Sequence, residues 1–199
     1  MKTAIHKFIQ NTFGIKLIQL LPKPAILEIK KRFGDKKLIG VEIGTYKGDN
    51  AVSILKTLNM KKLYLIDPYI FHDDWDSENE MGEIVDNEIL MEEIKAEAKF
   101  KVMSFYNKYE FVERFSKDAV NYIPNELDFV YIDGAHDFNS VMQDLNNYYP
   151  KIKRGGILCG HDADYNPVTQ ALIKFCYENK LKLNISKHDD WWIIIEGKK

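Results

Sequence analysis

From residue 38 onward, short segments rich in β-branched and aromatic residues alternate with segments whose apolar residues recur at helical spacing. Strands that are joined by helices run parallel, and the helices then cover both faces of the sheet. A mere turn separates the last two strands, so these should pair as an antiparallel hairpin. The pattern predicts an α/β fold of the Rossmann-like, doubly wound type: a mostly parallel seven-stranded sheet with an antiparallel C-terminal hairpin strand.

The boundaries of these elements come from apolar runs and from the turn residues that end them. The seven predicted strands are Leu38–Ile43, Leu63–Ile66, Glu110–Phe115, Leu127–Ile132, Ile157–Cys159, Leu181–Ser186 and Trp191–Glu196. Helices are predicted over Asp49–Leu58, Asn139–Tyr149 and Asn166–Tyr177. Ser116 is expected to be the N-cap of a further, short helix.

Length and composition restrict the class of protein. A chain of 199 residues, 45% of them hydrophobic, is the size of one domain with a core of its own. The longest apolar run, Trp191 to Ile195, is far too short for a membrane span. Cys159 and Cys176 have neither a disulfide nor a zinc spacing, which favours a reducing compartment. We therefore expect a cytoplasmic protein without integral membrane contact.

The near-neutral net charge of −2 conceals two strongly charged segments. Residues 1–37 hold nine Lys or Arg against two acids, whereas residues 73–93 hold ten acids and no Lys or Arg. Because the chain as a whole has no basic excess, a nucleic-acid partner is not expected. The first segment is predicted to be an N-terminal helical arm, 1–37, preceding a domain over 38–199 that carries an acidic lid-like insert at about 68–107.

Each of these two segments has more than one interpretation. The arm could cross the mouth of the active site, form a homodimer contact, or touch anionic lipid through its lysines. The insert could close over a substrate, with Tyr69, Phe71 and Trp75 as an aromatic wall. It could equally be a solvated acidic loop that leads into a packing helix.

The end of the first predicted strand has the sequence E-I-G-T-Y-K-G, residues 42–48. This is not the dinucleotide pattern G-x-G-x-x-G, but it resembles E/D-x-G-x-x-x-G, the first motif of S-adenosylmethionine-dependent methyltransferases. The resemblance implies a tight turn at Gly44 and a close approach at Gly48, with Thr45 and Tyr46 between them. Glu42 would receive the ammonium of the cofactor's methionine part.

The second predicted strand ends at Asp67-Pro68, where a carboxylate can accept hydrogen bonds from both ribose hydroxyls. The alternative is that Asp67 merely forms a turn before Pro68 and that Gly44 and Gly48 are ordinary loop glycines. If Gly44 does lie under the cofactor, Gly44→Val should abolish cofactor binding and leave the fold largely intact.

Two further stretches, D-F-V-Y-I-D-G-A-H at 128–136 and G-G-I-L-C-G-H-D at 155–162, resemble the small "family 24" class I methyltransferases. The resemblance covers about residues 38–165. It implies that Ser116, after the third strand, lies near the adenine, and that Asp133 also contacts the cofactor.

Asp133, His136, His161 and Asp162 all fall just after the fourth and fifth predicted strands, whose ends are neighbours in a parallel sheet. Methyl transfer to oxygen requires a hydroxyl to lose its proton, and these residues allow two solutions. His136 or His161 could act as a general base. Alternatively, Asp133, His161 and Asp162 could hold a divalent cation that acidifies the hydroxyl.

The metal solution resembles the metal-dependent catechol O-methyltransferases, which have an acid after the fourth strand and an acid–amide pair after the fifth. Here the second pair is His161-Asp162, and a histidine ligand suits Mn²⁺, Fe²⁺ or Zn²⁺ better than Mg²⁺. The structural alternative is that Asp133 ends a strand, Asp137 caps a helix, and His161 hydrogen-bonds to loop backbone.

Together these features predict an S-adenosylmethionine-dependent methyltransferase that methylates a hydroxyl on a small or sugar-like acceptor. A catalytically idle S-adenosylmethionine-binding partner subunit is the main alternative. A nicotinamide-dependent oxidoreductase is disfavoured by the missing third glycine and by the C-terminal hairpin.

Overall fold

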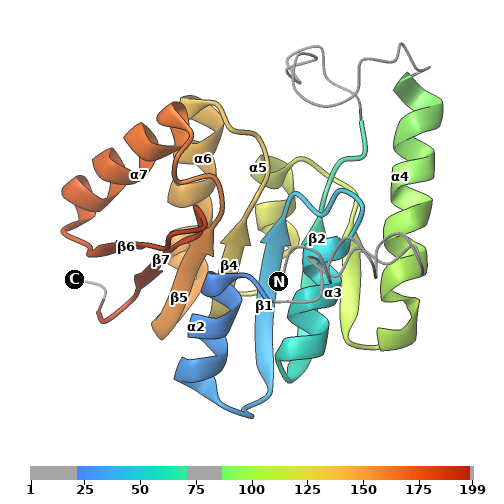
Figure 1. The fold of residues 1–199 in the computed structure, drawn as a ribbon, viewed down its shortest axis with the longest axis horizontal. Helices are drawn as coiled ribbons and strands as arrows, with labels where there is room; N and C mark the ends of the chain where they lie inside the picture. The colour runs from blue at the N-terminus through green and yellow to red at the C-terminus, as the bar shows by residue number, and fades with distance from the viewer. Residues whose placement is uncertain (1–21, 71–86, 198–199) are drawn as a thin grey trace, which may run out of the picture.

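The computed structural model describes residues 22–70 and 87–197. Its centre is a seven-stranded sheet in the order β3-β2-β1-β4-β5-β7-β6 (Figure 1). The strands are β1 (Leu38–Ile43), β2 (Met60–Ile66), β3 (Tyr109–Val112), β4 (Leu127–Ile132), β5 (Ile152–Gly160), β6 (Leu183–Ile185) and β7 (Trp191–Ile194). The first five are parallel, and β7 runs antiparallel to both β5 and β6. The predicted fold class is confirmed, and the hairpin inserts its last strand between β5 and β6.

Helices cover both faces of this sheet (Figure 1). They are α2 (Pro24–Phe33), α3 (Asp49–Thr57), α4 (Asn87–Val102), α5 (Ser116–Ala119), α6 (Phe138–Tyr148) and α7 (Asn166–Asn179), with 3-10 turns η2 (Met103–Phe105), η3 (Val120–Tyr122) and η4 (Tyr149–Lys151). Strand β4 shows how one strand serves two cores, because successive side chains point to opposite faces. Phe129 and Tyr131 pack with α2 and α3, whereas Val130 and Ile132 pack with α6 and α7.

Several predicted boundaries differ from the structure, including those of β2, β3, β5, β6, β7 and the short helix at Ser116. Strand β5 begins at Ile152 and runs through Gly155, which has a φ of 81°, so the two glycines lie inside the strand and do not open it. Strand β3 ends at Val112, before the charged Glu113. Ser116 is the first residue of α5 and makes no capping hydrogen bond, because the chain enters the helix one residue earlier, at Phe115.

The two segments outside the recognised motifs are described in part. Within the predicted arm, α2 begins at Pro24 and packs on the sheet through Ala25, Ile26 and Ile29, which are fully buried. Within the predicted insert, α4 buries Ile94 and Ala98. Residues 1–21 and 71–86, including Phe71 and Trp75, lie outside the described residues, so the lid and dimer interpretations stay predictions.

No helix within residues 22–70 and 87–197 combines enough length with enough apolar character to span a bilayer.

Candidate active site

The turn between β1 and α3 contains both motif glycines in left-handed backbone conformations. Gly44 has a φ of 84° and Gly48 a φ of 78°. A Cβ on Gly44 would overlap the carbonyl oxygen of Asp133, and one on Gly48 would press against Ala98 of α4. The chain's own packing therefore requires these glycines, whether or not a ligand lies beside them.

Glu42 lies at the end of β1 with no exposed surface, and its Oε1 accepts a 2.8 Å hydrogen bond from Asn50 Nδ2. Four buried side-chain oxygens of the described residues have no hydrogen-bond partner: Asp144 Oδ1 in α6 and, at this site, Glu42 Oε2, Thr45 Oγ1 and Asn50 Oδ1. Buried polar atoms are nearly always paired, so these three oxygens indicate a missing ligand. The Asn50 carbonyl oxygen and the oxygen of an ionised Glu42 carboxylate are acceptors, which suits a bound ammonium.

Burial raises the pKa of Glu42 to about 8. The hydrogen bond from Asn50 opposes this rise, the nearby Asp133 carboxylate adds to it, and the Lys23 ammonium opposes it. The Thr45 hydroxyl also stands near and opposes the rise, although it does not reach hydrogen-bond geometry. Without a ligand, Glu42 therefore holds its proton at neutral pH.

The raised pKa of Glu42 makes the stability of the ligand-free protein depend on pH. The folded chain binds this proton more tightly than the unfolded chain, so the free energy of unfolding falls as the pH rises from about 5 to about 8. Glu42→Gln should remove about 2–4 kcal/mol of that fall. Urea unfolding at pH 5 and pH 8 measures it, with the exposed Glu196→Gln as control. Equal pH dependence in wild type and Glu42→Gln would contradict the assignment.

Asp67 follows β2 and joins two loops. Its Oδ2 accepts the N–H of Tyr46 at 2.8 Å, and its Oδ1 accepts the N–H of Tyr69 at 2.9 Å. The Tyr69 hydroxyl in turn donates to the carbonyl of Tyr46 at 3.1 Å. A carboxylate has about four acceptor sites, so these contacts leave capacity for hydroxyl donors. Pro68, the other residue predicted at this strand end, follows directly and is half-buried.

Ser116 is held in place from α6. Its carbonyl accepts the Tyr148 hydroxyl at 2.8 Å, and its side chain hydrogen-bonds to Asp144. Burial raises the pKa of Asp144 to about 6, and this hydrogen bond opposes the rise. The predicted adenine-side residue therefore has a fixed position at the end of β3.

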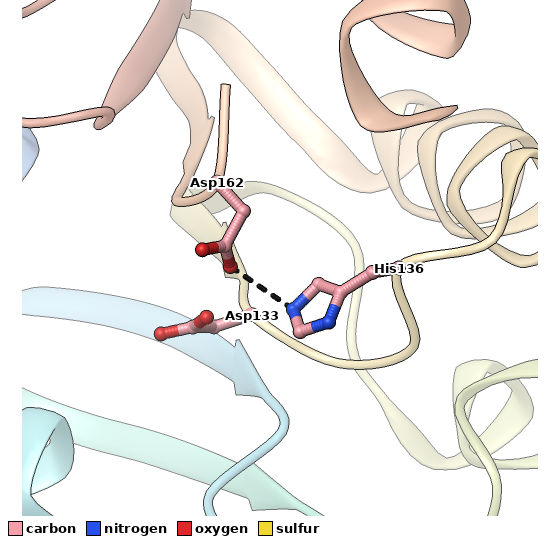
Figure 2. Close-up of side chains that lie close together, drawn as sticks. All are labelled: Asp133, His136 and Asp162. Atoms are coloured by element: carbon pink, nitrogen blue, oxygen red, sulfur yellow. Dashed lines mark ion pairs between the residues drawn. The ribbon is translucent and has the colours of Figure 1, made fainter. Parts of the chain in front are cut away.

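Three of the predicted chemical residues converge beyond the ends of β4 and β5. Asp133, His136 and Asp162 each place a ligand atom within 4.8 Å of the other two (Figure 2). Asp133 directly follows β4, His136 stands in the loop before α6, and Asp162 follows β5. We call these three residues the acid–histidine cluster. It lines a shallow pocket together with Gly134, His161 and Trp191.

Asp162 lies between two imidazoles. Its Oδ2 is 3.0 Å from His136 Nε2, and its Oδ1 is 2.9 Å from His161 Nδ1. Burial alone would raise the pKa of Asp162, but the hydrogen bonds and charges of the two histidines hold it well below its usual range. The carboxylate in turn raises the pKa of both His136 and His161.

The two histidines have different partners in the structure, and the sequence alone did not predict this difference. His136 joins Asp133 and Asp162, whereas His161 turns toward Asp162 and the buried Asp190, whose Oδ1 lies 3.8 Å from His161 Nε2. The residues whose ligand atoms lie together are Asp133, His136 and Asp162, and the metal set predicted from the sequence, Asp133, His161 and Asp162, stays a prediction. Asp137 accepts the N–H groups of Asn139 and Ser140 at 3.0 Å and is the N-cap of α6, as its alternative interpretation predicted.

Two functional candidates were missed by the sequence reasoning. Lys23 Nζ lies 3.0 Å from Asp133 Oδ2 and 5.5 Å from the centre of the Tyr131 ring. Asp190, fully buried, accepts the N–H of Ala25 at 2.8 Å and the Tyr131 hydroxyl at 3.2 Å. No local pattern marks either residue, because Lys23 is one of nine basic residues in the first 37 positions and Asp190 lies in an ordinary turn.

Comparison with known proteins agrees with this geometry. A family profile described as a methyltransferase domain, of the family 24 type, matches residues 41–163. An uncharacterized protein of Acanthamoeba polyphaga mimivirus is 28% identical over 147 residues, which make up 70% of this chain and 59% of that protein. The chain thus spans less than two thirds of this relative.

Solved structures share the fold at low sequence identity. The O-methyltransferase NovP has a TM-score of 0.61 and 17% identity, covering 85% of this chain and 78% of its own. An O-methyltransferase from Bacillus cereus in complex with S-adenosylhomocysteine has a TM-score of 0.61 and 11% identity, covering 96% and 97%. An rRNA methylase from Streptococcus thermophilus has a TM-score of 0.59 and 10% identity, covering 90% and 99%. The chain belongs to the matched family and is a class I S-adenosylmethionine-dependent methyltransferase domain.

Proposed function

We propose that this protein transfers the methyl group of S-adenosylmethionine to a hydroxyl of a small or sugar-like acceptor. The observation that carries the proposal is the adjacency of two features at the ends of β1, β4 and β5. The unpartnered acceptors Glu42 Oε2 and Asn50 Oδ1 suit an ammonium, and the acid–histidine cluster suits the activation of a hydroxyl.

The cofactor would be held by residues at three strand ends. Glu42 and Asn50 would accept the ammonium, Asp67 the ribose hydroxyls, and Ser116 would border the adenine, with the turn at Gly44, Thr45, Tyr46 and Gly48 below. When bound, S-adenosylmethionine supplies an electrophilic methyl group on a sulfonium. The chain's own task is to orient that group and to exclude water from it.

The acid–histidine cluster would hold a divalent cation through two carboxylates and one imidazole, a donor set that suits Mn²⁺, Fe²⁺ or Zn²⁺ better than Mg²⁺. Such a cation lowers the pKa of a bound hydroxyl and orients its oxygen. His161 lies behind Asp162 and fixes the orientation of that carboxylate. In the cation-free alternative, Asp162 binds Nε2 of His136 and leaves Nδ1 to accept the hydroxyl proton.

A small acceptor fits the charge of the chain better than a nucleic acid does. Structures of rRNA methylases share this fold, so the fold does not separate the two classes. However, 28 basic residues against 30 acidic ones leave no excess to neutralise a phosphate backbone. The carboxylates of Asp133 and Asp162 also line the pocket, and they would repel phosphates.

Metal removal tests the mechanism. We expect ethylenediaminetetraacetate to lower methyl transfer to a panel of phenols, catechols and glycosides by at least about 100-fold, and Mn²⁺ to restore it. Release of S-adenosylhomocysteine measures turnover. If the chelator leaves turnover unchanged, His136 is the base and no cation is involved. If S-adenosylhomocysteine binds but no hydroxyl in the panel is methylated, the idle partner subunit becomes the better interpretation.

A further inference from the structure

A lysine from outside the matched methyltransferase region reaches the cofactor end of the pocket. Lys23 directly precedes α2, and the family match begins at residue 41. Its ammonium lies 3.0 Å from Asp133 Oδ2, and its side chain is 32% exposed. The described residues therefore cover this side chain only in part.

The position of Lys23 is fixed from the opposite end of the chain. The buried Asp190 accepts the N–H of Ala25, in the first turn of α2, at 2.8 Å. The same carboxylate accepts the Tyr131 hydroxyl, and the Lys23 ammonium lies over the Tyr131 ring. A fully buried carboxylate that binds the start of a helix holds the residue before that helix in a defined place.

The charges around this position are predominantly negative. The Lys23 ammonium lies near three acids, Glu42, Asp133 and Asp190. Burial raises the pKa of Glu42 and of Asp190, and the positive charge of Lys23 opposes both rises. The amino-acid end of S-adenosylmethionine carries a carboxylate as well as an ammonium. Glu42 and Asn50 can receive the ammonium, but the carboxylate would be repelled by these acids without a compensating cation.

We infer that Lys23 binds the carboxylate of the cofactor's amino-acid end; this rests on the proposed function. An ammonium has three donors, and within the described residues Lys23 donates one hydrogen bond, to Asp133. It can therefore bind Asp133 and a ligand carboxylate together. Lys23 thus selects cofactors that retain the complete amino-acid group.

The test compares two ligands that differ in that carboxylate alone. Calorimetry would measure the Kd of S-adenosylhomocysteine and of its decarboxylated analogue, S-adenosyl-3-thiopropylamine, for the full chain. We expect wild type to prefer S-adenosylhomocysteine by about 10- to 100-fold, as for a charge-assisted hydrogen bond. Lys23→Met should lose or reverse this preference, and Lys23→Arg should keep most of it.

Matched controls separate this role from a structural one. Lys31→Met removes an exposed lysine of α2 that pairs with Glu28, and this variant should keep the wild-type preference. Lys23→Gln gives the same test if Lys23→Met does not fold. Retention of the preference in Lys23→Met or Lys23→Gln, or an equal weakening of both ligands in these variants, would overturn the inference. Failure of wild type to bind S-adenosylhomocysteine at all would instead overturn the proposed function, and this inference with it.

Discussion

Asp133→Asn is expected to lower methyl transfer by at least about 100-fold, because one side chain serves both halves of the site. Its carboxylate belongs to the acid–histidine cluster, and its Oδ2 lies 3.0 Å from Lys23 Nζ. Asparagine keeps the volume but removes the charge that a cation would require and that pairs with Lys23. Initial rates with saturating S-adenosylmethionine and the best hydroxyl acceptor of the panel would measure this effect.

The control for Asp133→Asn is Asp164→Asn, which removes an exposed acid two residues beyond Asp162. Its rate should stay within about twofold of wild type, since surface charges have small effects. Mn²⁺ affinity, measured by calorimetry, should fall in Asp133→Asn and stay unchanged in Asp164→Asn. A rate for Asp133→Asn within threefold of wild type would remove this residue from the mechanism.

Gly44→Val is expected to destabilise the fold on the order of 4 kcal/mol, which differs from the sequence-based expectation that it would spare the fold. Valine is β-branched and disfavours a φ of 84°. Its Cβ would also overlap the carbonyl of Asp133, which belongs to the adjacent strand end and cannot rotate away. Lost cofactor binding in this variant would therefore report unfolding as much as a lost contact.

Urea unfolding of Gly44→Val without ligand measures this loss directly. Gly197→Val is the matched control, because a Cβ there meets no atom within 4 Å, and its free energy of unfolding should stay within about 0.5 kcal/mol of wild type. Wild-type stability in Gly44→Val, combined with lost cofactor binding, would restore the original interpretation that Gly44 matters for the ligand alone.

The sheet was predictable because its central strands are mostly apolar segments that end at glycine or aspartate. Strands β1 and β4 begin and end at the predicted residues. The parallel order then places Asp133 and Asp162 at one edge, since the ends of neighbouring strands meet there. Strand β5 was predicted too short because Gly155 and Gly156 look like a turn, and the pairing with β4 overrides that local preference.

The inner arrangement of the site was not predictable for a different reason. Whether His136 or His161 joins the two acids depends on loop conformation, including the φ of 58° at Asp162, and residue type does not determine it. The contact from Ala25 to Asp190 spans 165 positions of the chain. No periodicity or motif connects residues so far apart, so Lys23 was assigned to an arm.

The hydrogen bond between Ala25 and Asp190 has a consequence for the newly made chain. A ribosome synthesises the methyltransferase motifs of residues 41–163 before it adds Asp190. Until that residue emerges, the start of α2 lacks its buried anchor, and Lys23 has no fixed place beside Asp133. The cofactor pocket is therefore completed only after Asp190 and β7 have been synthesised, when β7 enters the sheet beside β5 and the preceding Asp190 binds the start of α2.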